Sequence, residues 1–201
     1  QVTDGATVSM VDNTIANNAG AAGALIQGGT SLTFTGNKIG TIATGLSPAG
    51  NVAGLTIAAS TLTSVVIGGI TAALSNIFAA STTGAGLSIT ALAANDTSVT
   101  IQGNYVGVCA NTSTGEIVTS NLTTCKNGTT SGGTGMDLQQ GAITIGGDNS
   151  LAAAGTGTIA AGNVISNNRG SGIKLTSNVS SATIVGNIIG LIRTGAAGVF
   201  N

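Results

Sequence analysis

The sequence repeats one short motif, in which apolar and mostly polar residues alternate and then give way to Gly-Asn, Gly-Gly or Asp-Asn. Alternation with a period of two predicts a β-strand with one buried face. Gly and Asn tolerate the left-handed backbone of a sharp turn, so each strand is expected to end in one. The copies are Val8–Asn13, Leu32–Asn37, Val65–Gly69, Val99–Asn104, Ile143–Gly147 and Ala182–Asn187.

Two further strands accompany this motif. One has the pattern Gly, apolar, variable, apolar, and precedes the motif; its copies begin at Gly23, Gly54, Gly86, Gly135 and Gly172. The other follows the turn, and its copies begin at Asn37, Asn76, Asn104, Asn163 and Asn187. Repeats of three short strands that stack on one another predict an all-β fold. We expect a right-handed parallel β-helix, or β-solenoid, of about five three-strand coils with open ends.

Composition agrees with many short strands and narrows the function. Only 5% of residues are charged, 2% are aromatic, His is absent and Gly occurs 33 times. A net charge of -1 gives no basic surface for nucleic acid. The most apolar stretch, 65–80, is interrupted by polar residues and Gly, so we expect no membrane span. No metal site or cofactor is expected.

Three segments, 36–41, 66–69 and 162–168, resemble the Gly-Asn-rich repeats of bacterial and archaeal secreted surface proteins that have a pectin-lyase-like right-handed parallel β-helix. The resemblance extends from about Val8 to Asn201. It implies an extracellular or cell-surface location. The length and the spacing of the repeats indicate a single domain, 1–201, with an inserted surface loop at about 108–134. The resemblance leaves the function open, because that fold carries lyases, hydrolases, adhesins and passive stalks.

The inserted loop contains the two cysteines, Cys109 and Cys125. Their separation within a segment rich in Thr, Ser and Asn favours a local disulfide in an oxidising compartment, with two unlinked thiols as the alternative. Candidate glycosylation sequons lie in or beside this loop and elsewhere, at Asn95, Asn111, Asn121, Asn127 and Asn178.

Catalytic candidates are few. Asp137 is the one acidic residue expected to point outward from a recurring strand, where Lys174 of the next repeat would lie beside it. Without a second carboxylate or a His, a surface ion pair is favoured over catalysis, and the chain is expected not to be an enzyme. An outward column of Ser9, Thr33, Thr100, Thr144 and Thr183, interrupted by Val66, suits either an ordered polymer or ice, or simply the exposed side of a strand.

Equivalent corners are expected to stack their amides in a ladder of Asn13, Asn37, Asn104 and Asn187. Both ends of the repeat look uncapped: Val8 and Met10 would lie at one end, and Val199 and Phe200 at the other. The sequence therefore favours a structural subunit or segment of an extracellular filament or cell-surface stalk, in which copies stack head to tail. The alternatives are a polysaccharide-binding or polysaccharide-cleaving module, or an adhesin that binds through the cysteine loop. The expected partner is a second copy of the chain, with polysaccharide or a cell surface as further partners.

Overall fold

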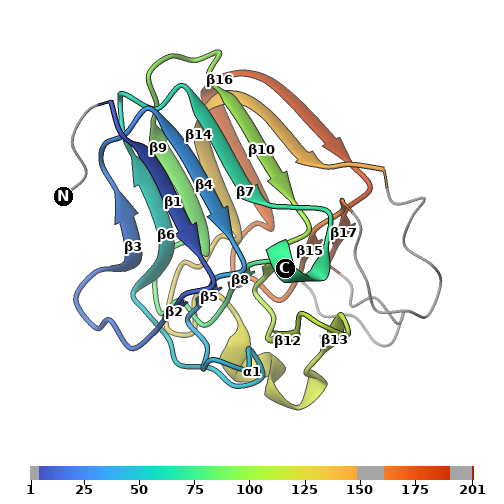
Figure 1. Cartoon of the computed structure of the whole chain (residues 1–201). Coiled ribbons are helices and arrows are strands. Elements are labelled where there is room, and N and C mark those ends of the chain that lie inside the picture. Colours follow the sequence, from blue (N-terminus) through green and yellow to red (C-terminus); the bar gives the residue numbers. More distant parts are fainter. Residues whose placement is uncertain (1–4, 149–160, 191–200) are drawn as a thin grey trace.

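A computed structural model describes residues 5–148, 161–190 and 201 (Figure 1). The chain is mostly strand. The largest sheet consists of β1 (Thr7–Val11), β3 (Ala22–Ile26), β4 (Ser31–Thr35), β6 (Ala53–Ala58), β7 (Ser64–Gly68), β9 (Leu87–Ala91), β10 (Ser98–Gln102), β14 (Met136–Gly146) and β16 (Ile173–Val185). A second sheet consists of β2 (Thr14–Ile15), β5 (Lys38–Ile39), β8 (Ile77–Phe78), β11 (Tyr105–Val106), β15 (Val164–Ile165) and β17 (Ile188–Ile189).

The remaining elements are short. The strands β12 (Ala110–Asn111) and β13 (Glu116–Ile117) form an antiparallel pair within the segment 108–134. A single turn of helix, α1 (Leu122–Cys125), follows the 3-10 helix Thr119–Asn121, and another 3-10 helix covers Ala72–Leu74. No helix among the described residues has the length and apolar character needed to cross a membrane.

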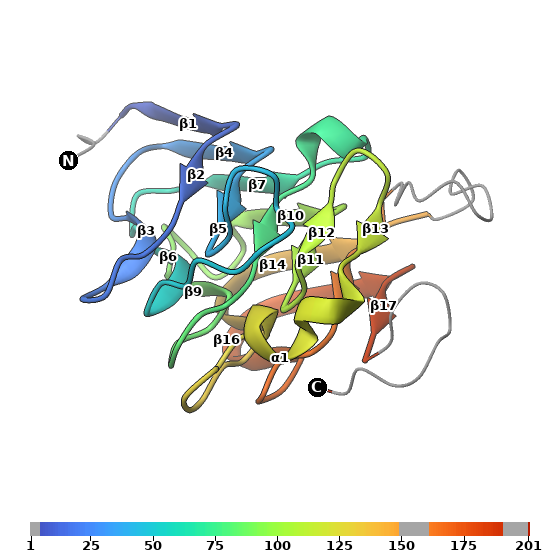
Figure 2. The same ribbon diagram turned by 90° about the horizontal axis from the view of Figure 1, so that it is seen from below.

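The two large sheets are parallel throughout. The nine-stranded sheet has the order β1-β4-β7-β10-β14-β9-β6-β3, with β16 also paired to β14, and the six-stranded sheet has the order β17-β15-β11-β8-β5-β2. The large sheet curves around the core as a half-barrel, and the six-stranded sheet lies across its open side (Figures 1 and 2). The described fold is therefore a curled half-barrel of parallel strands with few helices.

This finding corrects the expectation of a right-handed parallel β-helix with about five three-strand coils and open ends. In a three-strand coil the strand that begins at Gly135 and the motif Ile143–Gly147 would be separate strands on different faces. In the structure β14 runs unbroken through Gln139–Gly141 and pairs with both β9 and β10, which merges two expected faces into one sheet. At Gln139–Gly141 the register between β14 and β16 shifts, because a bulge absorbs the extra residues.

The individual strands nevertheless lie where the alternating pattern placed them. The repeated turn after the motif strand needs a left-handed residue: Gly36 and Gly103 have φ of 69° and 63°, and Asp12 takes the same place with φ of 57°. Asp adopts this conformation more readily than most residues, because its short side chain can hydrogen-bond to the local backbone.

Inward residues of the alternating strands form one apolar core between the sheets. Leu55, Ile67, Ile101 and Ile145 are completely buried. The rings of Phe34 and Phe78 stack in this core with their centroids 5.9 Å apart. Burying the aliphatic residues of many equivalent strands supplies the stabilisation that a chain with so few rings needs.

Candidate functional site

A ladder of asparagine side chains runs across the six-stranded sheet. It joins successive repeats of the chain, each of which contributes one strand to this sheet and is called a level. Its members are Asn13, Asn37, Asn76, Asn104, Asn163 and Asn187. In each pair the side-chain Nδ2 of one residue donates to Oδ1 of the next, at 2.8–3.2 Å. The backbone N–H donates to the same Oδ1. The four residues expected in a ladder thus lie in it, with Asn76 and Asn163 between them.

The direction of these bonds is the same at every step. Each amide accepts from the level nearer the N-terminus through Oδ1, and donates through N–H and Nδ2 toward the C-terminus. The interior rungs Asn37, Asn104 and Asn163 are completely buried. A buried amide without partners is costly, so this chain of bonds holds adjacent levels in register.

A second ladder, which the sequence analysis missed, runs beside the first. Its rungs are Asn18, Asn51, Asn127, Asn168 and Asn201, with Ser81 at the level between Asn51 and Asn127. Asn13 and Asn18 have the same separation as Asn163 and Asn168, and that spacing is the signal that could have revealed it. Asn76 and Ser81 repeat this separation, whereas insertions lengthen it at the other levels, which hides the pattern.

Inward side chains are exposed at the C-terminal end of the part of the stack that the structure describes. Ile184 of β16 is 45% exposed, whereas Ile145, its partner on β14, is completely buried. Ile189 of β17 is also 45% exposed, and its partner Ile165 is completely buried. The apolar cross-section of the core therefore reaches the surface at this end.

The N-terminal end is formed by the edge strands β1 and β2, and Figure 2 shows them on the side of the molecule opposite β16 and β17. Val8 is 7% exposed and Met10 is half-buried. Both lie on the edge strand β1, where they were expected. Val199 and Phe200, expected at the other end, lie outside the described residues.

An outward face of the large sheet carries a grid of hydroxyl groups. The expected column is in register from strand to strand: Ser9, Thr33, Val66, Thr100, Thr144 and Thr183. A neighbouring column consists of Thr7, Ser31, Ser64, Ser98, Ala142 and Ser181. Neither column includes a charged or aromatic side chain, so this face is neutral and polar.

Asp137 and Lys174 lie side by side on β14 and β16, as their positions in the repeat indicated. Lys174 Nζ is 3.4 Å from Asp137 Oδ1, and Gln139 Nε2 donates to Asp137 Oδ2. The Lys174 side chain is 53% exposed and that of Asp137 is 21% exposed, so water reaches the lysine end of this ion pair.

The cysteine loop is closed by the predicted disulfide between Cys109 and Cys125, with a Cα–Cα distance of 5.6 Å. Both cysteines are buried with Tyr105 and Ile117 in a small cluster under the loop. Against it lies a pocket of about 300 Å³ lined by Leu46, Asn111, Glu116, Ile117, Val118, Thr119 and Ser120. Its single carboxylate, on Glu116, has no basic side chain or second acid among these residues.

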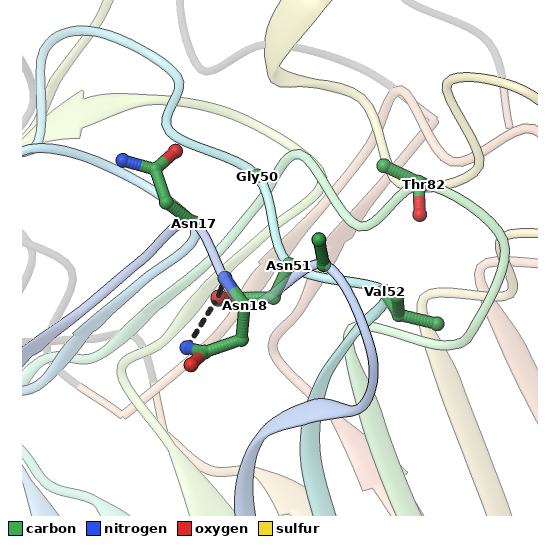
Figure 3. A pocket seen from close by; sticks show the side chains of 7 residues that line it. Asn17, Asn18, Gly50, Asn51, Val52 and Thr82 are labelled. Atoms are coloured by element: carbon green, nitrogen blue, oxygen red, sulfur yellow. Dashed lines mark hydrogen bonds between the residues drawn. The ribbon is translucent and has the colours of Figure 1, made fainter.

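A second pocket, of about 270 Å³, lies beside the second ladder (Figure 3). It is lined by Asn17, Asn18, Ala19, Gly50, Asn51, Val52 and Thr82. Asn18 Nδ2 donates to Asn51 Oδ1 at 2.8 Å within it. These residues offer amide and hydroxyl groups but nothing that titrates near neutral pH, so the pocket provides no general acid or base.

The sequons differ in accessibility. Asn95 and Asn178 are exposed. Asn111 and Asn121 are half-buried, and their side chains form hydrogen bonds with the backbone. Asn127 is completely buried, and its Nδ2 donates to Asn168 Oδ1 and to the carbonyl of Phe78. A glycan on Asn127 does not fit the folded chain, because the nitrogen that would carry it belongs to the second ladder.

The described residues contain no group of three or more His, Cys, Asp or Glu side chains able to hold a metal ion. Comparisons with family models, with curated proteins and with solved structures found no match. The resemblance to Gly-Asn-rich secreted surface proteins therefore stays a prediction, and the function must be argued from the geometry of this chain.

Proposed function

We propose that this chain is a structural subunit or segment of an extracellular filament or cell-surface stalk, whose copies stack head to tail by pairing their end strands. The observation that carries the proposal is the uncovered apolar end formed by β16 and β17, where Ile184 and Ile189 are each 45% exposed. Exposed apolar side chains at the end of a core, whose partners one strand further in are completely buried, indicate an interaction site.

The opposite end supplies a matching surface. β1 and β2 are edge strands, and all strands of both large sheets are parallel. Joining the C-terminal end of one copy to the N-terminal end of the next therefore continues each sheet with the same strand direction. Such a contact uses two different surfaces, and because it displaces each copy along the stacking axis it does not close into a ring and generates an open filament.

The disulfide supports an extracellular location, because disulfides persist mainly in oxidising compartments. A structural role, rather than an enzymatic one, is supported by the isolated ion pair of Asp137 and the uncharged pocket beside Asn51. The second candidate is a polysaccharide-binding module or adhesin, which the pocket at Glu116 and the hydroxyl face favour.

The test is electron microscopy and fibre diffraction of the purified chain over a range of concentrations. Strands about 4.8 Å apart in a sheet of six levels give an axial repeat of about 29 Å per subunit. Fibres with this repeat are expected for the wild type. Monomers that persist at millimolar concentration would refute the proposal.

Two variants separate end-to-end stacking from other association. Ile189→Lys places a charge on the uncovered end and is expected to abolish the fibres, because burying an unpaired charge is costly. Val66→Lys places the same charge on the outward face, where Val66 is 37% exposed, and is expected to leave them intact. Equal effects of the two substitutions would point to lateral association instead.

A further inference from the structure

We infer that both asparagine ladders continue across the junction between copies and set the register in which one copy docks on the next. Asn187 of one copy would donate to Oδ1 of Asn13 of the next, and Asn201 to Oδ1 of Asn18. This inference rests on the proposed function and adds to it a single register and the residues that select it.

The two ends of the first ladder are complementary. At the N-terminal end, Asn13 is exposed and its Oδ1 accepts no hydrogen bond from any described residue, although every later rung accepts two. At the C-terminal end, the backbone N–H of Asn187 lacks the Oδ1 acceptor that the preceding rungs have within the described chain. An open acceptor at one end thus faces an open donor at the other.

The second ladder repeats this arrangement. Asn18 is an exposed first rung, with Oδ1 unused by the described residues, and Asn201 is the rung after Asn168 and the last among the described residues. Asn201 Oδ1 already accepts from the N–H and Nδ2 of Asn168. Both ladders begin at the first level and end at the last. Continuing both of them across the junction therefore determines the position and the orientation of the next copy, whereas one ladder alone would leave its orientation free.

The backbone of the six-stranded sheet fits the same register. Inside the subunit, the N–H of Lys38 donates to the carbonyl of Asn13, and the N–H of Ile188 donates to that of Asn163. By the same rule, the N–H of Thr14 in the next copy meets the carbonyl of Asn187. At the junction, the large sheet would continue through pairing of β1 of the next copy with the second half of β16. The strand β3 belongs to the same level as β4, one level behind β1, so it takes no part in this contact.

Disulfide trapping tests the register. In this arrangement Ser9 of one copy lies opposite Thr183 of its neighbour, because both belong to one column. Facing residues of adjacent strands lie about 4.8 Å apart, within reach of a disulfide, whereas residues two positions out of register lie about 8 Å apart and beyond it. The native cysteines are already paired and do not compete.

A Ser9→Cys chain is mixed with a Thr183→Cys chain, assembled and mildly oxidised. The expected result is a disulfide-linked dimer at least about tenfold more abundant than that from the control mixture of Thr7→Cys with Thr183→Cys. Fibres in which the control pair links equally well would overturn the register and leave stacking intact. Absence of fibres in every mixture would overturn both.

Amide variants test the ladders themselves. Asn13→Ala removes an acceptor at the junction, and we expect the critical concentration for assembly to rise about tenfold, the equivalent of one or two hydrogen bonds. Asn95→Ala, at an exposed position away from both ends, should leave it unchanged. An unchanged critical concentration for both Asn13→Ala and Asn18→Ala would refute ladder continuation, even if fibres form.

Discussion

Replacing the buried rung Asn104 by Ala should destabilise the fold far more than replacing the exposed rung Asn13. The Oδ1 of Asn104 accepts from the N–H and Nδ2 of Asn76. Its Nδ2 is directed at Ile67 O, Gln102 O and Asn163 Oδ1, at 2.9–3.0 Å, although it has only two protons to share. Asn104 therefore makes four effective hydrogen bonds in a site with no access to solvent.

At about 1 kcal/mol for each buried bond, Asn104→Ala should lower the free energy of unfolding by about 4 kcal/mol. Asn13→Ala loses two bonds, to Val11 O and Asn37 Oδ1, at a position that water reaches, so about 1 kcal/mol is expected. Domains of this kind are stable by only about 5–15 kcal/mol, so the first change removes a large fraction of the total.

Urea unfolding measures the difference. Tyr105 is the only tyrosine, the chain has no tryptophan, and Tyr105 is 1% exposed, so its fluorescence and the far-UV circular dichroism report on unfolding independently. Asn104→Ser is a milder second variant, since Ser81 already occupies a level of the other ladder. Equal losses for Asn104→Ala and Asn13→Ala would show that the ladder does not hold the levels together.

Three further predictions concern single sites. Gly40→Ala should lower Tm by at least about 5 °C, because φ is +80° and the added Cβ would lie 1.9 Å from Ala79 O, whereas Gly20→Ala, with nothing within 4 Å, should not lower it. Replacing Cys109 and Cys125 by Ser should leave the far-UV spectrum unchanged but speed cleavage by a Glu-specific protease at Glu116, the only glutamate. The reason is that the loop loses about 3 kcal/mol of entropic constraint. An unchanged cleavage rate would mean that packing alone orders the loop. Lys174→Ala should change the free energy of unfolding by less than about 1 kcal/mol at low salt and less still at 1 M salt, and a larger loss would show that the Asp137 pair is more than a surface contact.

The sequence predicted the strands because their signal is local. Alternation of apolar residues and a turn at Gly36 or Gly103 can be recognised within a few residues, and such segments are strands in the structure. The disulfide was predictable for a different reason: with two cysteines in the chain, only one pairing is possible.

The arrangement of the strands was not predictable in the same way. Gly141, with φ of 120°, suits a break between two strands, yet the chain continues as one strand through a bulge, because pairing with β9, β10 and β16 on both sides holds it extended. The second ladder was not predicted because, of its asparagines, only Asn51 follows a Gly, whereas most rungs of the first ladder are marked by a Gly-Asn turn. The sequon at Asn127 does not predict whether this residue is accessible. Its Nδ2 donates to Asn168, which is far away in the sequence, and a local motif does not reveal that contact.

The end strands differ from the edges of most sheets in a way that favours end-to-end assembly of copies over side-by-side association. Edge strands usually carry charges or Pro that discourage pairing with another chain. Among the end strands β1, β2, β16 and β17, only β16 carries a charge, on Lys174, and that charge is paired with Asp137. The outward face of the large sheet, in contrast, carries hydroxyl groups that water can solvate. Pairing at the ends satisfies backbone groups as well as burying apolar area, whereas contact between the outward faces leaves no unpaired strand edge to satisfy, so association should extend the sheets along their own axis.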